Sequence, residues 1–73
     1  MEGTEEEYLE ELGKIIHARR NAMGFTLEAL AKKINVSKGH LSKIEHGLNP
    51  TSITILRRIA GQLNTTIGKL CDF

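Results

Sequence analysis

The chain has 73 residues, of which 40% are hydrophobic, 4% aromatic and 26% charged. A chain of this length forms one small domain with an aliphatic core, and it is too short to build a deep substrate cleft with walls of its own. It contains no run of 18 apolar residues, and its acidic start fits neither a signal peptide nor a transit sequence, so we expect no membrane span and no leader. The single cysteine, Cys71, cannot form an intrachain disulfide, which suits a reducing cytoplasm.

The charges are distributed unevenly along the chain, although the formal net charge is only +1. Six of the nine acidic residues lie in residues 1–11, which contain no Lys or Arg. From residue 12 onward, ten basic residues face three acidic ones. We therefore distinguish an acidic N-terminal lead-in, residues 1–11, from a basic domain, residues 12–73. A basic domain fits a polyanion-binding module or a solvated surface of mixed charge, and charge alone does not decide between them.

The first helix is predicted to begin after Thr4, because Thr4 and Glu7 have the spacing of a capping box. Gly24 is its expected end. The apolar residues that recur at helical spacing between them are Leu9, Leu12, Ile16 and Met23.

Two short helices are predicted next, within residues 26–46. Thr26 and Ser37 are good N-caps for them, and Asn35 between them tolerates the left-handed backbone in which helices often end. Gly47 is the expected end of the second. Their expected buried residues are Leu27, Leu30, Ala31, Ile34, Leu41 and Ile44.

A loop around Pro50 separates these helices from two more. Either Thr51 or Ser52 caps a fourth helix that Asn64 ends, and either Thr65 or Thr66 begins a short fifth one. No segment alternates long enough to predict a strand, so the expected fold class is all-α. The expected buried residues of these last two helices are Ile53, Leu56, Ile59, Ala60, Leu63, Ile67 and Leu70.

Residues 26–46 carry the functional signal. Two short helices joined by a turn of about three or four residues form a helix-turn-helix unit, whose second helix can enter a major groove of DNA. Ala31 is small enough to let the second helix cross closely over the first, and Val36 would fill the space between them.

The segments GKIIHARRNAMGF, TLEALAKKINVSKGHLSKIEHG and NPTSITILRRIAGQLNTTIGKL resemble, in order, the five helices of the phage repressor and Cro family, also called the XRE family. The resemblance covers Gly13 to Leu70. It implies a five-helix repressor-like fold and a sequence-specific transcription regulator, a repressor that binds double-stranded DNA at a palindromic operator as a homodimer. It also implies a prokaryotic or phage protein of the cytoplasm without enzymatic activity, cofactor, metal or small-molecule ligand.

The resemblance assigns roles to individual residues. Lys38 and Lys43 match base-reading positions, where lysine favours guanine O6 and N7. Gly39 and His40 lie beside them on the same edge, although Gly39 has no side chain with which to read a base. Leu27 stands where many members carry a glutamine that contacts DNA. The residues expected at phosphates are Arg19, Thr26, Ser37, Ser42, Asn49, Thr51, Ser52 and Thr54, with Thr51 or Ser52 also serving as a helix cap.

Other family roles are structural. Arg20 and Glu45 match a buried ion pair that orients the third helix without necessarily adding stability. Arg57 and Arg58 are expected on a solvated face or at the rim of an interface. The dimer surface would lie on the fourth and fifth helices, with Ile55, Cys71 and Phe73 as candidates.

Two other interpretations concern a metal site and a protein partner. The residues His17, His40, His46 and Cys71 match no compact zinc pattern, so no metal site is expected. A protein-interaction module, of an antitoxin-like or adaptor kind, is the alternative function. Gly39 and Leu27 favour it, because neither has a polar side chain at a position where DNA-binding proteins of this kind usually carry one. The acidic lead-in could also bind a basic partner.

Overall fold

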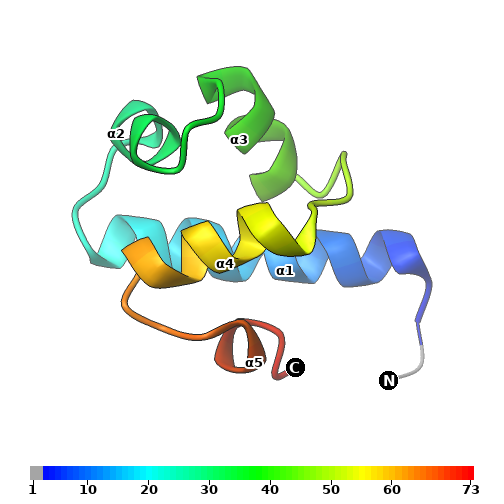
Figure 1. Cartoon of the computed structure of the whole chain (residues 1–73). Helices are drawn as coiled ribbons and strands as arrows, with labels where there is room; N and C mark the ends of the chain where they lie inside the picture. The colour runs from blue at the N-terminus through cyan, green and yellow to red at the C-terminus, as the bar shows by residue number, and fades with distance from the viewer. Residues whose placement is uncertain (1–2) are drawn as a thin grey trace.

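The computed structural model describes residues 3–73, which form five helices (Figure 1). They are α1 (Glu5–Ala22), α2 (Leu27–Lys33), α3 (Lys38–Glu45), α4 (Ile53–Gln62) and α5 (Ile67–Leu70). No strand occurs within residues 3–73, which confirms the predicted all-α class. Glu2 of the acidic lead-in lies outside the described residues, and the other acidic residues of the lead-in belong to α1. None of the helices in this range is long and apolar enough to span a bilayer.

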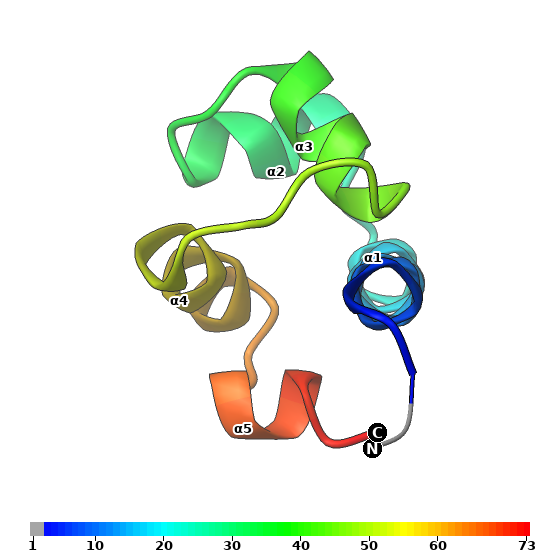
Figure 2. The ribbon, with the colours of Figure 1, turned by 90° about the vertical axis from the view of Figure 1, so that its right-hand side faces the viewer.

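The helices are arranged in tiers. In Figure 2, α2 and α3 lie together at the top, α1 and α4 lie below them on opposite sides, and α5 closes the bottom. The C-terminus lies at the same end as α5. The pair α2–α3 is therefore held at one end of the molecule, away from the chain's C-terminus.

A hydroxyl side chain caps the start of every described helix, as expected from the sequence. In each case the oxygen accepts a hydrogen bond from the backbone N–H three residues on, which satisfies one of the free donors of the first turn. The structure selects Ser52 over Thr51 and Thr66 over Thr65. The caps are Thr4, Thr26, Ser37, Ser52 and Thr66. Asn35 (φ 61°) takes the left-handed backbone predicted for it, and Asn64 (φ 56°), predicted to end the fourth helix, takes the same conformation.

The core is aliphatic and receives residues from all five helices. Its fully buried members are Ile16, Leu30, Ile34, Leu41, Ile59, Leu63 and Leu70. The predicted inward face of α1 is correct at Leu12 and Ile16 but wrong at Met23, which is 43% exposed. Met23 is the residue after the last turn of α1, where the helical spacing no longer determines which way a side chain points. The expected burial of Ile53 is also wrong, because this first residue of α4 is 65% exposed.

α1 and α3 approach each other at Gly13. A Cβ atom at this position would lie 2.4 Å from the carbonyl oxygen of Glu45 and 2.7 Å from that of Ile44. Both neighbours are backbone atoms, so no side-chain rotation could relieve the contact. Glycine at position 13 therefore allows the end of α3 to rest directly on α1.

The C-terminal residues fold back onto the start of α1. The rings of Tyr8 and Phe73 pack with centroids 4.9 Å apart. A hydrogen bond with the Cys71 side chain raises the pKa of the Tyr8 phenol above its ordinary value of 10.0, and desolvation adds to the rise. This contact ties the end of the chain to its first helix.

The raised pKa of Tyr8 has a measurable consequence. Because the folded state holds the phenol proton more tightly than the unfolded state, this contribution to stability is complete below pH 10 and decreases as the pH rises through the folded-state pKa. Tyr8 is the only tyrosine and the chain lacks tryptophan, so ultraviolet absorbance of the phenolate reports this group alone. Titration in the native state should give a higher midpoint than titration in denaturant. Equal midpoints would contradict the contact between Tyr8 and Cys71.

Candidate nucleic-acid interface

The helix-turn-helix unit is formed by α2 and α3. The turn between them is fixed by a hydrogen bond from the Val36 N–H to the Ala31 carbonyl, 3.0 Å long. Ala31 is buried in the core, and Val36 packs against the core. α2 buries Leu30 and Ala31, α3 buries Leu41 and Ile44, and the opposite face of α3 remains open to solvent. A rigid helix with one exposed face is what major-groove reading requires.

Three of the four residues expected to read bases lie on this exposed face. Lys38, Gly39 and Lys43 are all exposed on α3. A Cβ atom at Gly39 would meet nothing within 4 Å, so the helix surface is bare between the two lysines. The reading edge of α3 therefore offers two ammonium groups separated by accessible backbone.

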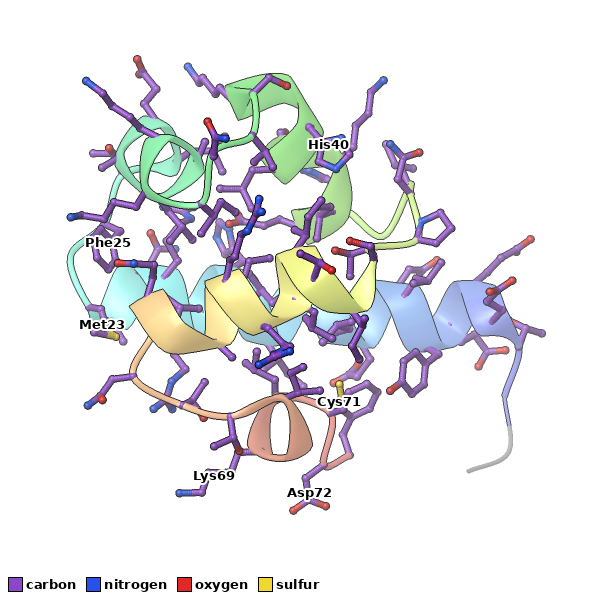
Figure 3. All side chains as sticks on the ribbon, viewed as in Figure 1. Met23, Phe25, His40, Lys69, Cys71 and Asp72 are labelled. Carbon is purple, nitrogen blue, oxygen red and sulfur yellow. The ribbon has the colours of Figure 1, made fainter. Side chains whose placement is uncertain are left out.

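His40 is placed differently. It is half-buried, and Figure 3 shows its ring beside the α3 ribbon. Its Nε2 atom is buried and has no hydrogen-bond partner among the described residues. A base contact through Nε2 would require the ring to rotate, so His40 is a weaker base-reading candidate than either lysine.

Most of the expected phosphate contacts lie at the starts of α2, α3 and α4 and in the loop before α4, whereas Ser42 lies in the middle of α3 and Arg19 on α1. Thr26, Ser37 and Ser52 each use the hydroxyl oxygen to accept a cap hydrogen bond, which leaves the hydroxyl hydrogen free to be donated to a phosphate. The cap and phosphate roles are thus compatible. Thr54 is exposed, whereas Ser42, Asn49 and Thr51 are partly buried.

Arg19 has a structural contact that its sequence position did not predict. Its Nε atom donates to the carbonyl of Leu63 at 3.0 Å, and its Nη2 atom donates to that of Asn64 at 3.3 Å. These are carbonyls at the C-terminal end of α4, which lack partners inside their own helix. The side chain joins α1 to the end of α4, and the phosphate contact expected for Arg19 stays a prediction beside this structural role.

The predicted ion pair between Arg20 and Glu45 is present and buried. Nε of Arg20 lies 2.7 Å from Oε2 of Glu45, and Nη2 lies 3.2 Å from Oε1, a bidentate arrangement with side-chain exposures of 8% and 4%. Arg20 also donates to the carbonyl of Phe25 at 2.7 Å. The pair therefore connects α1, the segment leading into α2, and the end of α3.

Two further partners in this framework were not foreseen from the sequence. Nδ1 of His17 lies 2.8 Å from Oε1 of Glu45, so the histidine joins the ion pair at the protein surface. Arg58, expected on a solvated face or an interface rim, donates to the carbonyl of Ile34 at 3.3 Å and so caps the end of α2. Neither contact has a local sequence signal, because each joins residues at least 24 positions apart. No cluster of three metal-ligating side chains occurs within residues 3–73.

Comparison with known proteins agrees with this geometry. Residues 16–70 match the helix-turn-helix family. The HTH-type transcriptional regulator SlrR of Bacillus subtilis (strain 168) is 36% identical over 63 residues, which cover 84% of this chain and 41% of SlrR. The regulator SinR of the same organism is also 36% identical, over 84% of this chain and 56% of SinR. The chain thus spans only part of the length of both relatives.

Among solved structures, the clp gene regulator ClgR from Corynebacterium glutamicum superposes with a TM-score of 0.85 at 29% identity, over 89% of this chain and 83% of that one. The family match covers more than half of the chain and includes both helices of the α2–α3 unit. The chain therefore belongs to the helix-turn-helix family of the XRE type, as its sequence resemblance indicated.

Proposed function

We propose that this chain is a DNA-binding domain of a transcription regulator, which reads a specific sequence by inserting the exposed face of α3 into the major groove. The observation that carries this proposal is the exposed edge with Lys38 and Lys43, held rigidly by the buried ion pair beneath it. The names of SlrR and SinR as HTH-type transcriptional regulators support it.

The regulator acts as a homodimer and a repressor. A single module of this size buries roughly 600–1,000 Å² on DNA, which is too little for tight specific binding. Two copies with recognition helices about 34 Å apart would reach successive major grooves of a palindromic operator. Of the candidate dimer residues, Cys71 and Phe73 lie beside Tyr8, and Phe73 remains 38% exposed and available to a second copy.

Selection of binding sites from random DNA duplexes tests the function directly. We expect one half-site to be enriched in two inverted copies with a fixed spacing. Affinity for the selected duplex should fall about a thousandfold between 50 and 200 mM salt, because each phosphate contact releases counterions. A flat salt response, or no enriched sequence, would contradict the proposal.

Two substitutions separate the reading of bases from the binding of phosphates. Lys38→Ala should change which duplexes are preferred, since it removes a base contact, and the expected loss of discrimination is roughly tenfold. Thr54→Val should weaken all duplexes to a similar extent, because a phosphate contact carries no sequence information. Competition binding on the selected site and its point variants measures both. The reverse pattern would show that another face meets the DNA.

A protein-interaction module remains the second candidate function, and a specific observation favours it. The position of Gly39 is bare, and Leu27 presents a half-buried apolar side chain where a polar one would serve DNA better. One superposing solved structure, with a TM-score of 0.80 and 34% identity over 84% of this chain, is a complex of the SinR protein with the SinI protein. Absence of salt-sensitive gel retardation on genomic fragments at micromolar protein would favour this second function.

A further inference from the structure

An exposed ion pair joins the first turns of α2 and α3. Nζ of Lys38 lies 3.5 Å from Oε1 of Glu28, and the two side chains are 60% and 75% exposed. A pair this open to water contributes less than about 1 kcal/mol to stability. The pair therefore matters little for stability. It matters for DNA binding, because it lies on the helix-turn-helix unit.

Glu28 lies in the first turn of α2, where the helix N-terminus favours a carboxylate, and its side chain is exposed beside the proposed DNA-reading helix. Within residues 26–46 the only other acidic residue is Glu45, whose carboxylate is buried against Arg20. An exposed carboxylate beside a polyanion is repelled by the phosphates, and the repulsion is offset by a neighbouring cation such as Lys38 and by any hydrogen bond that the carboxylate accepts from the DNA. In the major groove the available donors are the amino groups of cytosine and adenine.

The order of groups on a base pair decides between these two donors. Across the major groove a G·C pair presents two acceptors, N7 and O6 of guanine, followed by the N4 amino donor of cytosine. An A·T pair presents acceptor, donor, acceptor. The Lys38 ammonium favours guanine, whose N7 and O6 both accept from it, over adenine, whose N6 amino donor beside N7 repels it. On a G·C pair the Glu28 carboxylate then faces the cytosine amino group.

We propose that Glu28 and Lys38 read a single G·C pair as one unit, with Glu28 as a specificity-determining residue. The inference rests on the proposed DNA-binding function and deepens it. Gly39, the next residue on α3, has no side chain to share or compete for that base pair, and the space around it is open. Glu28 thus distinguishes between base pairs at a point where Gly39, without a side chain, cannot.

The test is binding-site selection with four proteins: the unchanged chain, Glu28→Ala, Lys38→Ala and the control Glu11→Gln. Glu11 is an exposed acid on α1, so the control removes the same charge outside the α2–α3 unit. We expect Glu28→Ala and Lys38→Ala each to lower the G·C preference roughly tenfold, at the same position of the half-site. Glu11→Gln should leave every position unchanged.

A second readout follows from charge. Glu28→Ala should bind random-sequence duplex several-fold more tightly than the unchanged chain, because a repulsive carboxylate has been removed. The inference is overturned if Glu28→Ala selects the same site with the same preferences, or if the two variants relax different positions. If the unchanged chain enriches no sequence at all, the proposed function itself is wrong. Circular dichroism on each variant establishes that the helices are intact.

Discussion

Replacing Gly13 with alanine is expected to destabilise the fold by about 3 kcal/mol, the upper part of the range for overpacked cores. The new Cβ would fall within 2.4 to 2.8 Å of backbone atoms of Ile44 and Glu45, so α3 would have to move away from α1 as a unit. A domain of this length has a total stability of roughly 4–11 kcal/mol, and the loss would be a large share of it. Thermal unfolding followed by circular dichroism measures the effect.

The chain offers a matched control for this change. Gly61 lies in α4, is exposed, and has open space around its Cβ position. Gly61→Ala should therefore stabilise the protein by up to about 1 kcal/mol, since alanine favours a helix over glycine. Equal unfolding midpoints for the Gly13 and Gly61 variants would show that α1 and α3 do not approach closely. DNA affinity should fall with Gly13→Ala only, because that variant displaces the recognition helix.

The features that the sequence predicted correctly are those with a local cause. A hydroxyl cap needs only its own residue and an amide three positions away, so Thr4, Thr26 and Ser37 could be identified without knowing the tertiary fold. The same holds for Asn35 and Asn64, whose left-handed backbone ends a helix where it stands. These local signals, together with the helical spacing of aliphatic residues, were enough to predict five helices in order.

Features set by contacts between distant segments were not predictable in this way. Arg19 and Arg58 resemble ordinary surface arginines in sequence, yet each donates to the carbonyl end of another helix. His17 carries no sign that its ring meets Glu45, 28 residues later. Of these contacts between distant side chains, the Arg20–Glu45 ion pair was predicted, because the family resemblance implied it.

The candidate site shows the same division. The exposure of Lys43 follows from helical spacing, which turns it away from Leu41, whereas Lys38 lies three residues before Leu41 on the same side and is exposed as the first residue of α3. The partial burial of His40 also agrees with spacing, since His40 lies four residues before the buried Ile44. The proximity of Lys38 to Glu28 does not follow from spacing, because it depends on how α2 and α3 cross.

Glu45→Ala is expected to cost about 3–5 kcal/mol, comparable to or larger than the loss from Gly13→Ala. The substitution leaves the guanidinium of Arg20, 8% exposed, buried without its carboxylate. It also removes the partner of His17. Chemical denaturation gives the free energy of unfolding, and the exposed acid Glu11, changed to alanine, is the control. That control should stay within about 0.5 kcal/mol of the unchanged chain.

The double variant Arg20→Met/Glu45→Leu separates stability from orientation. Because the charges leave together, no buried charge remains unpaired, and much of the lost stability should return. The recovery should be incomplete, since the carbonyl of Phe25 also loses its donor. DNA affinity should nevertheless remain reduced at least tenfold, because apolar side chains cannot replace the bidentate hydrogen bonds that fix the end of α3. A double variant with full affinity would show that packing alone, including the close contact at Gly13, sets the angle of the recognition helix.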